Sequence, residues 1–397
     1  MLQPGTFGLT LLLAMLTALG PLSMDMYLPS LPDIAHVLGA PVARTQLTIS
    51  SYLIGFAVGQ MIYGPLSDRY GRRPVLLAAV ALYLASTLAC AAAQSVDLLI
   101  AARLLQGISG SGAIVLARAI VRDVYSGVQA ARELSLMGSI SATAPIVAPM
   151  IGGVLQAGFG WRANFICMSV GGLIALLVAG RLLPETLRPD NRASPLSFFS
   201  MMRGYGAVAR HRGFLVYLGI ITTTYAGLFA WVSGASVVLQ GVYGLSAVAF
   251  GFTFALGAAG YMLGAMIATR LVVRLGLDRT IGVGVVVIAA GGLSLALAVA
   301  TGVPGLWLVA AMALYLAGVG LAMPQAMAGA LTPFPDRAGT AASLMGLVQQ
   351  ALAAVIAAVI GAYLVQSAWP VTGVVVAMGC LTFLLWALTR GMRARAR

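Results

Sequence analysis

Long stretches without a single charge restrict this chain more than any other feature. Three of them cover residues 213–269, 280–335 and 338–389, and one charge at the centre of a bilayer costs about 2.5 to 3.5 kcal/mol. Only 8% of the 397 residues are charged and 60% are hydrophobic, whereas charged residues make up about 25% of a soluble domain. A soluble globular fold is therefore excluded, and the sequence predicts a helical protein that crosses a membrane many times.

The apolar runs also predict the number of crossings. A membrane span needs about 20 mostly apolar residues. The first half contains six such runs, at residues 7–28, 45–67, 74–96, 98–117, 134–157 and 163–180. Each of the three long stretches is long enough for two spans and contains a break, at residues 241–247, 301–305 or 367–370, where glycine or proline favours chain reversal. We expect an all-α membrane protein with twelve transmembrane helices.

The arginines predict the orientation, since positively charged loops stay in the cytoplasm. With the N-terminus inside, 20 of the 23 arginines fall in cytoplasmic loops or in the C-terminal tail. Arg44 and Arg162 lie outside with Asp33 and Asp97, and Arg103 falls within a span. The net charge of +13 is thus explained by topology, which argues against a nucleic-acid partner. We expect both termini in the cytoplasm.

A polar segment near the midpoint divides the chain. Residues 181–212 contain three prolines and six arginines, which predicts a six-helix half at 1–182, a cytoplasmic linker at 183–212 and a second six-helix half at 213–397. A short repeat supports this division, because RYGRR at 69–73 resembles RLGLDR at 274–279, with their glycines 205 residues apart. Two pseudo-symmetric halves are typical of transporters whose substrate site lies between them near mid-membrane.

One loop carries a strong resemblance to a known family. Residues 64–73 read GPLSDRYGRR, which resembles the G-x-x-x-D-R-x-G-R-R/K loop of the major facilitator superfamily between the second and third spans. The resemblance implies that Asp68 faces the positive end of helix eleven and that Arg72 or Arg73 pairs with Asp123 near the end of helix four. Such contacts would act as a conformational switch, although the arginines could also serve only to set topology. The residues assigned to the switch are Gly64, Asp68, Arg69, Gly71, Arg72, Arg73 and Asp123.

Two further segments resemble motifs of proton-coupled members. RLLQG at 103–107 is similar to the R-x-x-Q-G element of the fourth span. Residues 144–153, APIVAPMIGG, resemble the antiporter motif G-x-x-x-G-P-x-x-G-G of the fifth span, with alanine in place of both leading glycines. We expect a kink in this span, formed by Pro145, Pro149, Gly152 and Gly153.

Three segments narrow the resemblance to one group of transporters. PLSMDMYLP at 21–29, GQMIYGP at 59–65 and AGTAASL at 338–344 resemble the Bcr/CflA-type bicyclomycin and chloramphenicol resistance exporters. The similarity covers essentially the whole chain. It implies proton-driven export of drug-like molecules across the bacterial inner membrane by a monomer. The proton gradient would supply the energy, and the resemblance implies no cofactor.

Asp25 is the acid that we place inside a span, between Pro21 and Pro29. Burial favours the neutral form of a carboxyl group and a nearby cation favours its charged form. A carboxyl whose surroundings change can therefore couple proton binding to transport, and Arg103 could tune it by approaching in one state and withdrawing in another. A permanent structural ion pair between Asp25 and Arg103 is the alternative.

The substrate pocket is predicted from residue type. Aromatic and methionine side chains suit bulky apolar ligands, although the same residues are also common in ordinary helix packing. The predicted lining consists of Asp25, Tyr27, Tyr52, Gln106, Met137, Phe229 and Trp231.

Other functions fit the sequence less well. A proton-coupled uptake symporter for a nutrient shares the fold but should carry more polar residues deep in its spans. An intramembrane enzyme would need a nucleophile with a base or a metal cluster, and both histidines, His36 and His211, fall in loops. We therefore expect a transporter rather than an enzyme, with a drug-like substrate, protons and membrane lipid as its partners and with no metal site.

Overall fold

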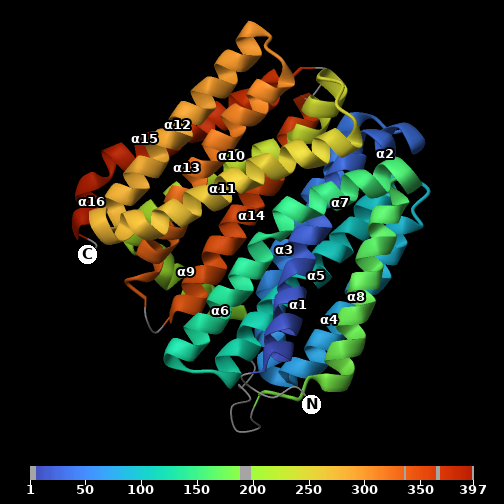
Figure 1. Cartoon of the computed structure of the whole chain (residues 1–397). Coiled ribbons are helices and arrows are strands. Elements are labelled where there is room, and N and C mark those ends of the chain that lie inside the picture. The colour runs from blue at the N-terminus through green and yellow to red at the C-terminus, as the bar shows by residue number, and fades with distance from the viewer. Residues whose placement is uncertain (1–5, 188–197, 335–336, 364–366, 396–397) are drawn as a thin grey trace. The chain divides into compact units, whose positions relative to one another are not determined.

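A computed structural model describes residues 6–187, 198–334, 337–363 and 367–395. Every regular element in these ranges is helical (Figure 1). Twelve helical segments are long and apolar enough to cross a membrane, which confirms the predicted number. Contacts divide the chain into unit 1, Met1–Leu196, and unit 2, Ser197–Arg397.

Unit 1 holds the first six spans. Its elements are α1 (Phe7–Asp25), η1 (Leu28–Ser30), α2 (Leu31–Val37), α3 (Val42–Tyr70), α4 (Arg72–Ala91), α5 (Val96–Val124), α6 (Gly127–Ala142), α7 (Ala144–Phe159) and α8 (Arg162–Leu182). The first span combines α1, η1 and α2, and the fifth combines most of α6 with α7. Unit 1 therefore contains two spans that are interrupted partway.

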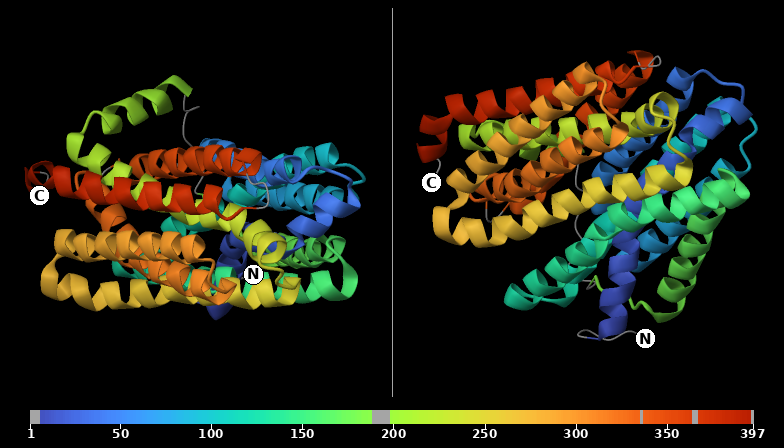
Figure 2. Two further views of the ribbon diagram at one scale, coloured as in Figure 1. Left: turned by 90° about the horizontal axis from the view of Figure 1, so that it is seen from above. Right: turned by 45° about the horizontal axis from the view of Figure 1, so that its top comes forward.

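Unit 2 holds the other six spans. Its elements are α9 (Phe198–Ala209), α10 (Arg212–Ser236), η3 (Val237–Val242), α11 (Ala247–Leu275), α12 (Leu277–Thr301), α13 (Gly305–Leu331), α14 (Ala338–Tyr363), α15 (Trp369–Leu388) and α16 (Arg390–Arg395). Figure 2 shows the long helices of this unit, yellow to red, running side by side, with α9 lying outside them. Of these elements, α9 contacts α10 and α14.

The helices run past the apolar stretches that predicted them. The second span was expected at residues 45–67, but α3 continues through the charged Asp68 to Tyr70. The fourth was expected at 98–117, but α5 extends from Val96 to Val124. Backbone hydrogen bonding continues where a helix leaves the hydrocarbon, because charges near the ends of a span cost much less than charges at its centre. The positions of charged residues are therefore a better guide to the membrane boundary than the ends of the helices are.

The two repeated glycines occupy the same position in their units. Gly71 joins α3 to α4 at φ +99°, and Gly276 joins α11 to α12 at φ +76°. Residues with a side chain rarely adopt positive φ values, so glycine is favoured at both turns. The repeat found in the sequence thus corresponds to a repeated turn between the second and third helices of each half.

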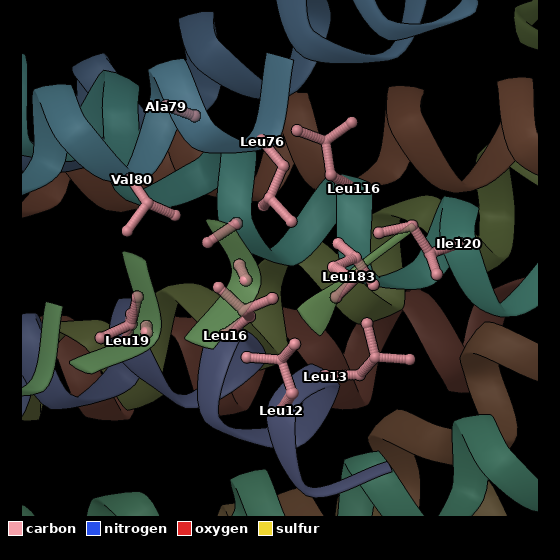
Figure 3. Packing of buried hydrophobic residues seen from close by; sticks show 14 of the residues in the cluster. Leu12, Leu13, Leu16, Leu19, Leu76, Ala79, Val80, Leu116, Ile120 and Leu183 are labelled. Atoms are coloured by element: carbon pink, nitrogen blue, oxygen red, sulfur yellow. The ribbon is translucent and has the colours of Figure 1, made fainter. Parts of the chain in front are cut away.

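The apolar core of unit 1 surrounds α1. Leucines of this helix face side chains from α4 and α5 (Figure 3). The cluster includes Leu12, Leu13, Leu16, Leu19, Leu76, Val80, Leu116, Ile120 and Leu183. Because this packing surrounds α1 on several sides, it fixes the position of the residues at the end of the helix, where Asp25 lies.

Close backbone contact joins α3 to α5. A methyl group added at Gly55 or Gly59 of α3 would overlap backbone atoms of α5, and one at Gly107 would overlap the Tyr52 carbonyl. Small residues let membrane helices approach closely and gain van der Waals contact. These glycines set the distance at which Tyr52 of α3 meets Arg103 of α5.

Candidate functional site

Asp25 lies where the first span breaks. It is the last residue of α1, and a turn through Met26 and Tyr27 leads into η1. Pro21 lies inside α1, and Pro29 lies in η1. The Asp25 side chain is buried. A buried carboxyl group at the end of a broken helix is a functional site by default in a membrane span.

Neighbouring helices hold this break in place. A methyl group added at Gly152 of α7 would overlap the Met26 carbonyl oxygen, so only glycine allows this approach. Asn164 of α8 donates hydrogen bonds from Nδ2 to Ser30 Oγ at 2.8 Å and to the Gly152 carbonyl at 3.3 Å. The motif glycine Gly152 therefore packs directly against the residue that follows Asp25.

Arg103 lies fully buried in an aromatic cage. Its guanidinium carbon is 4.5 Å from the centre of the Tyr27 ring and 4.3 Å from that of Tyr52. Arg103 Nη1 donates to the Ser23 carbonyl at 2.9 Å and to Gln106 Oε1 at 2.6 Å. Aromatic faces attract a cation most strongly where water is excluded, and this attraction offsets part of the cost of burying the charge.

Asp25 and Arg103 do not form an ion pair in this structure. Across the described ranges the ion pairs are Arg44–Asp97, Arg72–Asp68, Arg72–Asp123 and Arg393–Asp278. Nε and Nη2 of Arg103 are buried and have no hydrogen-bond partner. The guanidinium therefore has two donor atoms available for an acceptor that this conformation does not supply.

Three of the predicted pocket residues come together around Arg103. The Tyr27 hydroxyl is hydrogen-bonded to Thr48 Oγ1, and the Tyr52 hydroxyl donates to the Gly20 carbonyl at 3.0 Å. The third, Gln106, is fully buried. In the conformation described, each of these three side chains contacts Arg103.

The other predicted pocket residues pack within their own units. Met137 of α6 belongs to the apolar cluster around α1. Phe229 and Trp231 are buried in α10 of unit 2, and the Phe229 ring lies 4.5 Å from that of Tyr225. Aromatic and methionine side chains in a span serve packing as well as binding, and residue type alone does not separate the two.

Polar side chains that were not predicted lie next to the residues that hold Arg103. Ser23 Oγ is hydrogen-bonded to the Tyr83 hydroxyl at 2.6 Å, and Gln106 Nε2 donates to Thr87 Oγ1 at 2.9 Å. Tyr83, Thr87 and Cys90 are buried at helical spacing in α4. That spacing was the available signal for a polar face on the third span.

Glu133 lies one residue before the fifth span expected at residues 134–157. The structure places it in α6, at the start of the fifth span, where Glu133 Oε2 accepts a hydrogen bond from Thr10 of α1 at 2.7 Å. Within the described ranges, no group of three or more His, Cys, Asp and Glu side chains could hold a metal ion.

A network of charges surrounds the turn between α3 and α4. Arg72 Nε lies 2.7 Å from Asp123 Oδ2, while Arg72 Nη1 lies 2.5 Å from Asp68 Oδ1 and 2.7 Å from Ser67 Oγ. Arg72 is thus the arginine that pairs with Asp123, and Arg73 instead donates from Nη2 to the Gly180 carbonyl at 2.6 Å. One guanidinium therefore links the ends of α3 and α5 to the start of α4.

Glu185 completes this network and was not predicted. Its carboxylate accepts the backbone N–H groups of Arg72 at 2.9 Å and Arg73 at 3.2 Å. The first amides of a helix have no partner within the helix, and a carboxylate satisfies them while interacting favourably with the helix dipole. A methyl group at Gly71 would overlap this carboxylate. Glu185 therefore ties the segment after α8 to the turn at Gly71.

Replacing Arg72 with lysine is expected to lower the free energy of unfolding by about 1 to 3 kcal/mol, because one ammonium group cannot bridge both Asp68 and Asp123 as the guanidinium fork does. The solvent exposure of Asp68 keeps the loss below that of a fully buried pair. Thermal unfolding in detergent would measure it. The matched control is Arg69→Lys, since Arg69 is exposed and stacks only on Tyr70, 5.1 Å from its ring centre. An equal loss in both variants would contradict the prediction.

Comparison with known proteins places these features in a family context. The sequence profile of the Major Facilitator Superfamily matches residues 13–357. The chain is 36% identical over 358 residues to an uncharacterized MFS-type transporter, YdgK, of Bacillus subtilis, covering 89% of this chain and 88% of that protein. It is 31% identical over 369 residues to a bicyclomycin resistance protein homolog of Haemophilus influenzae, covering 93% and 92%.

A solved structure shares the fold. The crystal structure of a D-xylose-proton symporter superimposes with a TM-score of 0.78, covering 97% of each chain at 18% sequence identity. At this identity the similarity concerns the arrangement of the helices and not the substrate.

Proposed function

Because the chain belongs to the major facilitator superfamily and is a multi-pass membrane transporter, we propose that it exports drug-like small molecules in exchange for protons. The observation that supports the exchange is the buried carboxyl group of Asp25 at the end of α1, in the same unit as the buried Arg103 guanidinium, which has two donor atoms without partners and which donates to the carbonyl of Ser23, two residues before Asp25. The name of a relative, a bicyclomycin resistance protein homolog, supports a drug as the cargo. The resemblance seen in the sequence extends the class to amphenicols and other lipophilic compounds.

Exchange requires that one group serve the proton and the substrate in turn. Asp25 binds a proton from the outer side and releases it to the cytoplasm when drug enters, in a site that opens alternately to the two sides of the membrane. The Arg103 guanidinium favours proton release when it approaches the carboxylate, since a nearby cation stabilises the charged form. In the conformation described, Arg103 is held by Ser23 and Gln106 instead.

The location and orientation in the cell are part of this proposal, the location from the family resemblance and the orientation from the charge distribution. The protein lies in the bacterial inner membrane with both termini in the cytoplasm, an orientation supported by the arginine-rich turn at Gly71. It acts as a monomer without a cofactor, and the proton gradient supplies the energy.

Everted vesicles test this proposal. Vesicles energised by respiration acidify their lumen, and lumenal pH is followed with a fluorescent dye while chloramphenicol, bicyclomycin or tetraphenylphosphonium is added. A compound that drives protons out of the lumen only when the protein is present supports antiport. If none of them moves protons and the protein instead drives proton-coupled uptake of a sugar or organic acid into cells, the symporter is the better description.

Alanine at Gly152 is expected to reduce drug-dependent proton release roughly tenfold or more, because its methyl group overlaps the Met26 carbonyl and displaces the end of α1. Gly158→Ala is the matched control. Gly158 lies in the same helix, and a methyl group there would meet no other atom within 4 Å. The prediction is contradicted if the two variants, at equal amounts in the membrane, release protons equally well.

A further inference from the structure

We propose that Thr87 of α4 is a positioning residue for proton coupling, which acts through Gln106 to hold the Arg103 guanidinium clear of Asp25. This inference rests on the antiport function proposed above. It adds a residue that belongs to none of the motifs found in the sequence and that contacts neither Asp25 nor Arg103 in any hydrogen bond of the described structure.

The side chains of Thr87, Gln106 and Arg103 are linked by a continuous series of buried hydrogen bonds. Thr87, Gln106 and Arg103 each have 0% of their surface exposed. Gln106 Nε2 donates to Thr87 Oγ1 at 2.9 Å, and Gln106 Oε1 accepts from Arg103 Nη1 at 2.6 Å. Hydrogen bonds shielded from water are costly to break, because the groups left behind have no water to bond instead.

The donor and acceptor in each of these hydrogen bonds follow from the number of protons that each group carries. The Thr87 hydroxyl carries one proton and donates it to the Tyr83 carbonyl at 2.6 Å. Its oxygen can then only accept, so the Gln106 side chain must turn its NH₂ group toward Thr87 and its oxygen toward Arg103. A guanidinium can only donate, which matches that oxygen. Thr87 and Arg103 therefore require the same orientation of the Gln106 amide, and Thr87 holds the amide from the side away from Arg103.

This orientation restrains the cation. Nη1 of Arg103 is held by Gln106 Oε1 and the Ser23 carbonyl, while Nε and Nη2 remain without partners. Without Thr87, the Gln106 amide would lose the bond that holds it on the side away from Arg103, and the restraint on Nη1 would weaken. The released guanidinium would then be able to bring its free donors to the Asp25 carboxylate.

The ionisable neighbours of Arg103 come from three elements. Tyr27 follows α1, Tyr52 lies on α3, and Tyr83 and Cys90 lie on α4. Asp25 lies at the end of α1, two residues after Ser23, whose carbonyl accepts from Arg103. A sixth group, Glu133 of α6, contacts α1 near its start, through Thr10. Asp25 is the only carboxyl group in this set at the Arg103 end of α1.

The test compares Thr87→Val with Thr87→Ser. Valine has the shape of threonine without the hydroxyl, whereas serine keeps it. Everted vesicles carrying each variant are assayed for proton release driven by chloramphenicol, bicyclomycin or tetraphenylphosphonium over a range of pH. We expect the midpoint of the pH profile to move to lower pH by roughly 0.5 to 1 unit for Thr87→Val and to stay at the wild-type value for Thr87→Ser.

Two more variants separate positioning from packing. Gln106→Met has a similar length but no amide, and it should move the midpoint in the same direction even if Thr87→Val fails to accumulate. Ser86→Ala is the matched control, since Ser86 is a buried neighbour on α4 whose hydroxyl does not contact Gln106. Ser86→Ala should leave the midpoint unchanged.

The outcomes separate this inference from the proposed function. If the wild-type protein releases no protons with any of the three compounds, the antiport proposal fails and this inference fails with it. If the wild-type protein releases protons but the valine and methionine variants keep its midpoint, antiport stands and the role of Thr87 is refuted. A shift in Thr87→Ser or Ser86→Ala as large as that in Thr87→Val would assign the effect to packing.

Discussion

Asparagine at position 25 is expected to reduce drug-dependent proton release to the level of vesicles that lack the protein. The substitution keeps the size and polarity of the side chain but removes the group that gains and loses a proton. Asp25 is buried at the end of α1. Two other acids of unit 1 have partners of their own: Glu133 accepts a hydrogen bond from Thr10, and Asp97 is paired with Arg44. Asp33, which follows in α2, accepts a hydrogen bond from Gln156. We therefore expect none of these described acids to replace Asp25.

Two controls make this result specific. Asp97→Asn removes an acid from the same unit, but Asp97 is exposed and paired with Arg44 on the surface, so we expect wild-type release. Asp25→Glu restores a carboxyl group on a longer side chain, and we expect part of the signal to return. Wild-type proton release from Asp25→Asn, at equal protein in the membrane, would remove Asp25 from the coupling mechanism.

The sequence predicted the spans well because charge is so costly inside a membrane. The turn between α12 and α13 falls at residues 301–305 as expected, with Gly302 at φ +65°. Helix ends were predicted poorly, since α5 continues to Val124 beyond the apolar run. The backbone hydrogen bonds of a helix form both in lipid and in water. Apolar residues therefore predict where the membrane lies and not where the helix stops.

The site was predicted by residue type but not by geometry. Asp25 and Arg103 stood out because charges in spans are rare. The cage around Arg103 depends on how closely α3 and α5 approach each other at Gly55 and Gly107. The sequence alone does not show which residues of the two helices lie opposite each other. The role of Thr87 was hidden for the same reason, because a threonine in an apolar helix usually bonds only to its own backbone.

Replacing Arg103 with methionine is expected to preserve the stability of the protein but to abolish transport. Arg103 is buried without an ion pair, and replacing a buried charged network with apolar groups of similar volume is often neutral or stabilising by about 1 to 4 kcal/mol. A methionine fills similar space and packs well against the rings of Tyr27 and Tyr52. The variant should therefore accumulate normally and unfold at the same temperature as the wild type or higher.

Proton release should nonetheless be lost from Arg103→Met, because an uncharged side chain cannot draw the proton from Asp25. Arg103→Lys keeps the charge but not the planar fork that lies between two rings and donates to both Ser23 and Gln106. We expect it to release protons only weakly. Two measurements on the same purified variants, thermal unfolding and drug-driven proton release after reconstitution, decide the matter. If Arg103→Met loses stability and transport together, Arg103 is a structural residue, and the charge that acts on Asp25 must come from elsewhere.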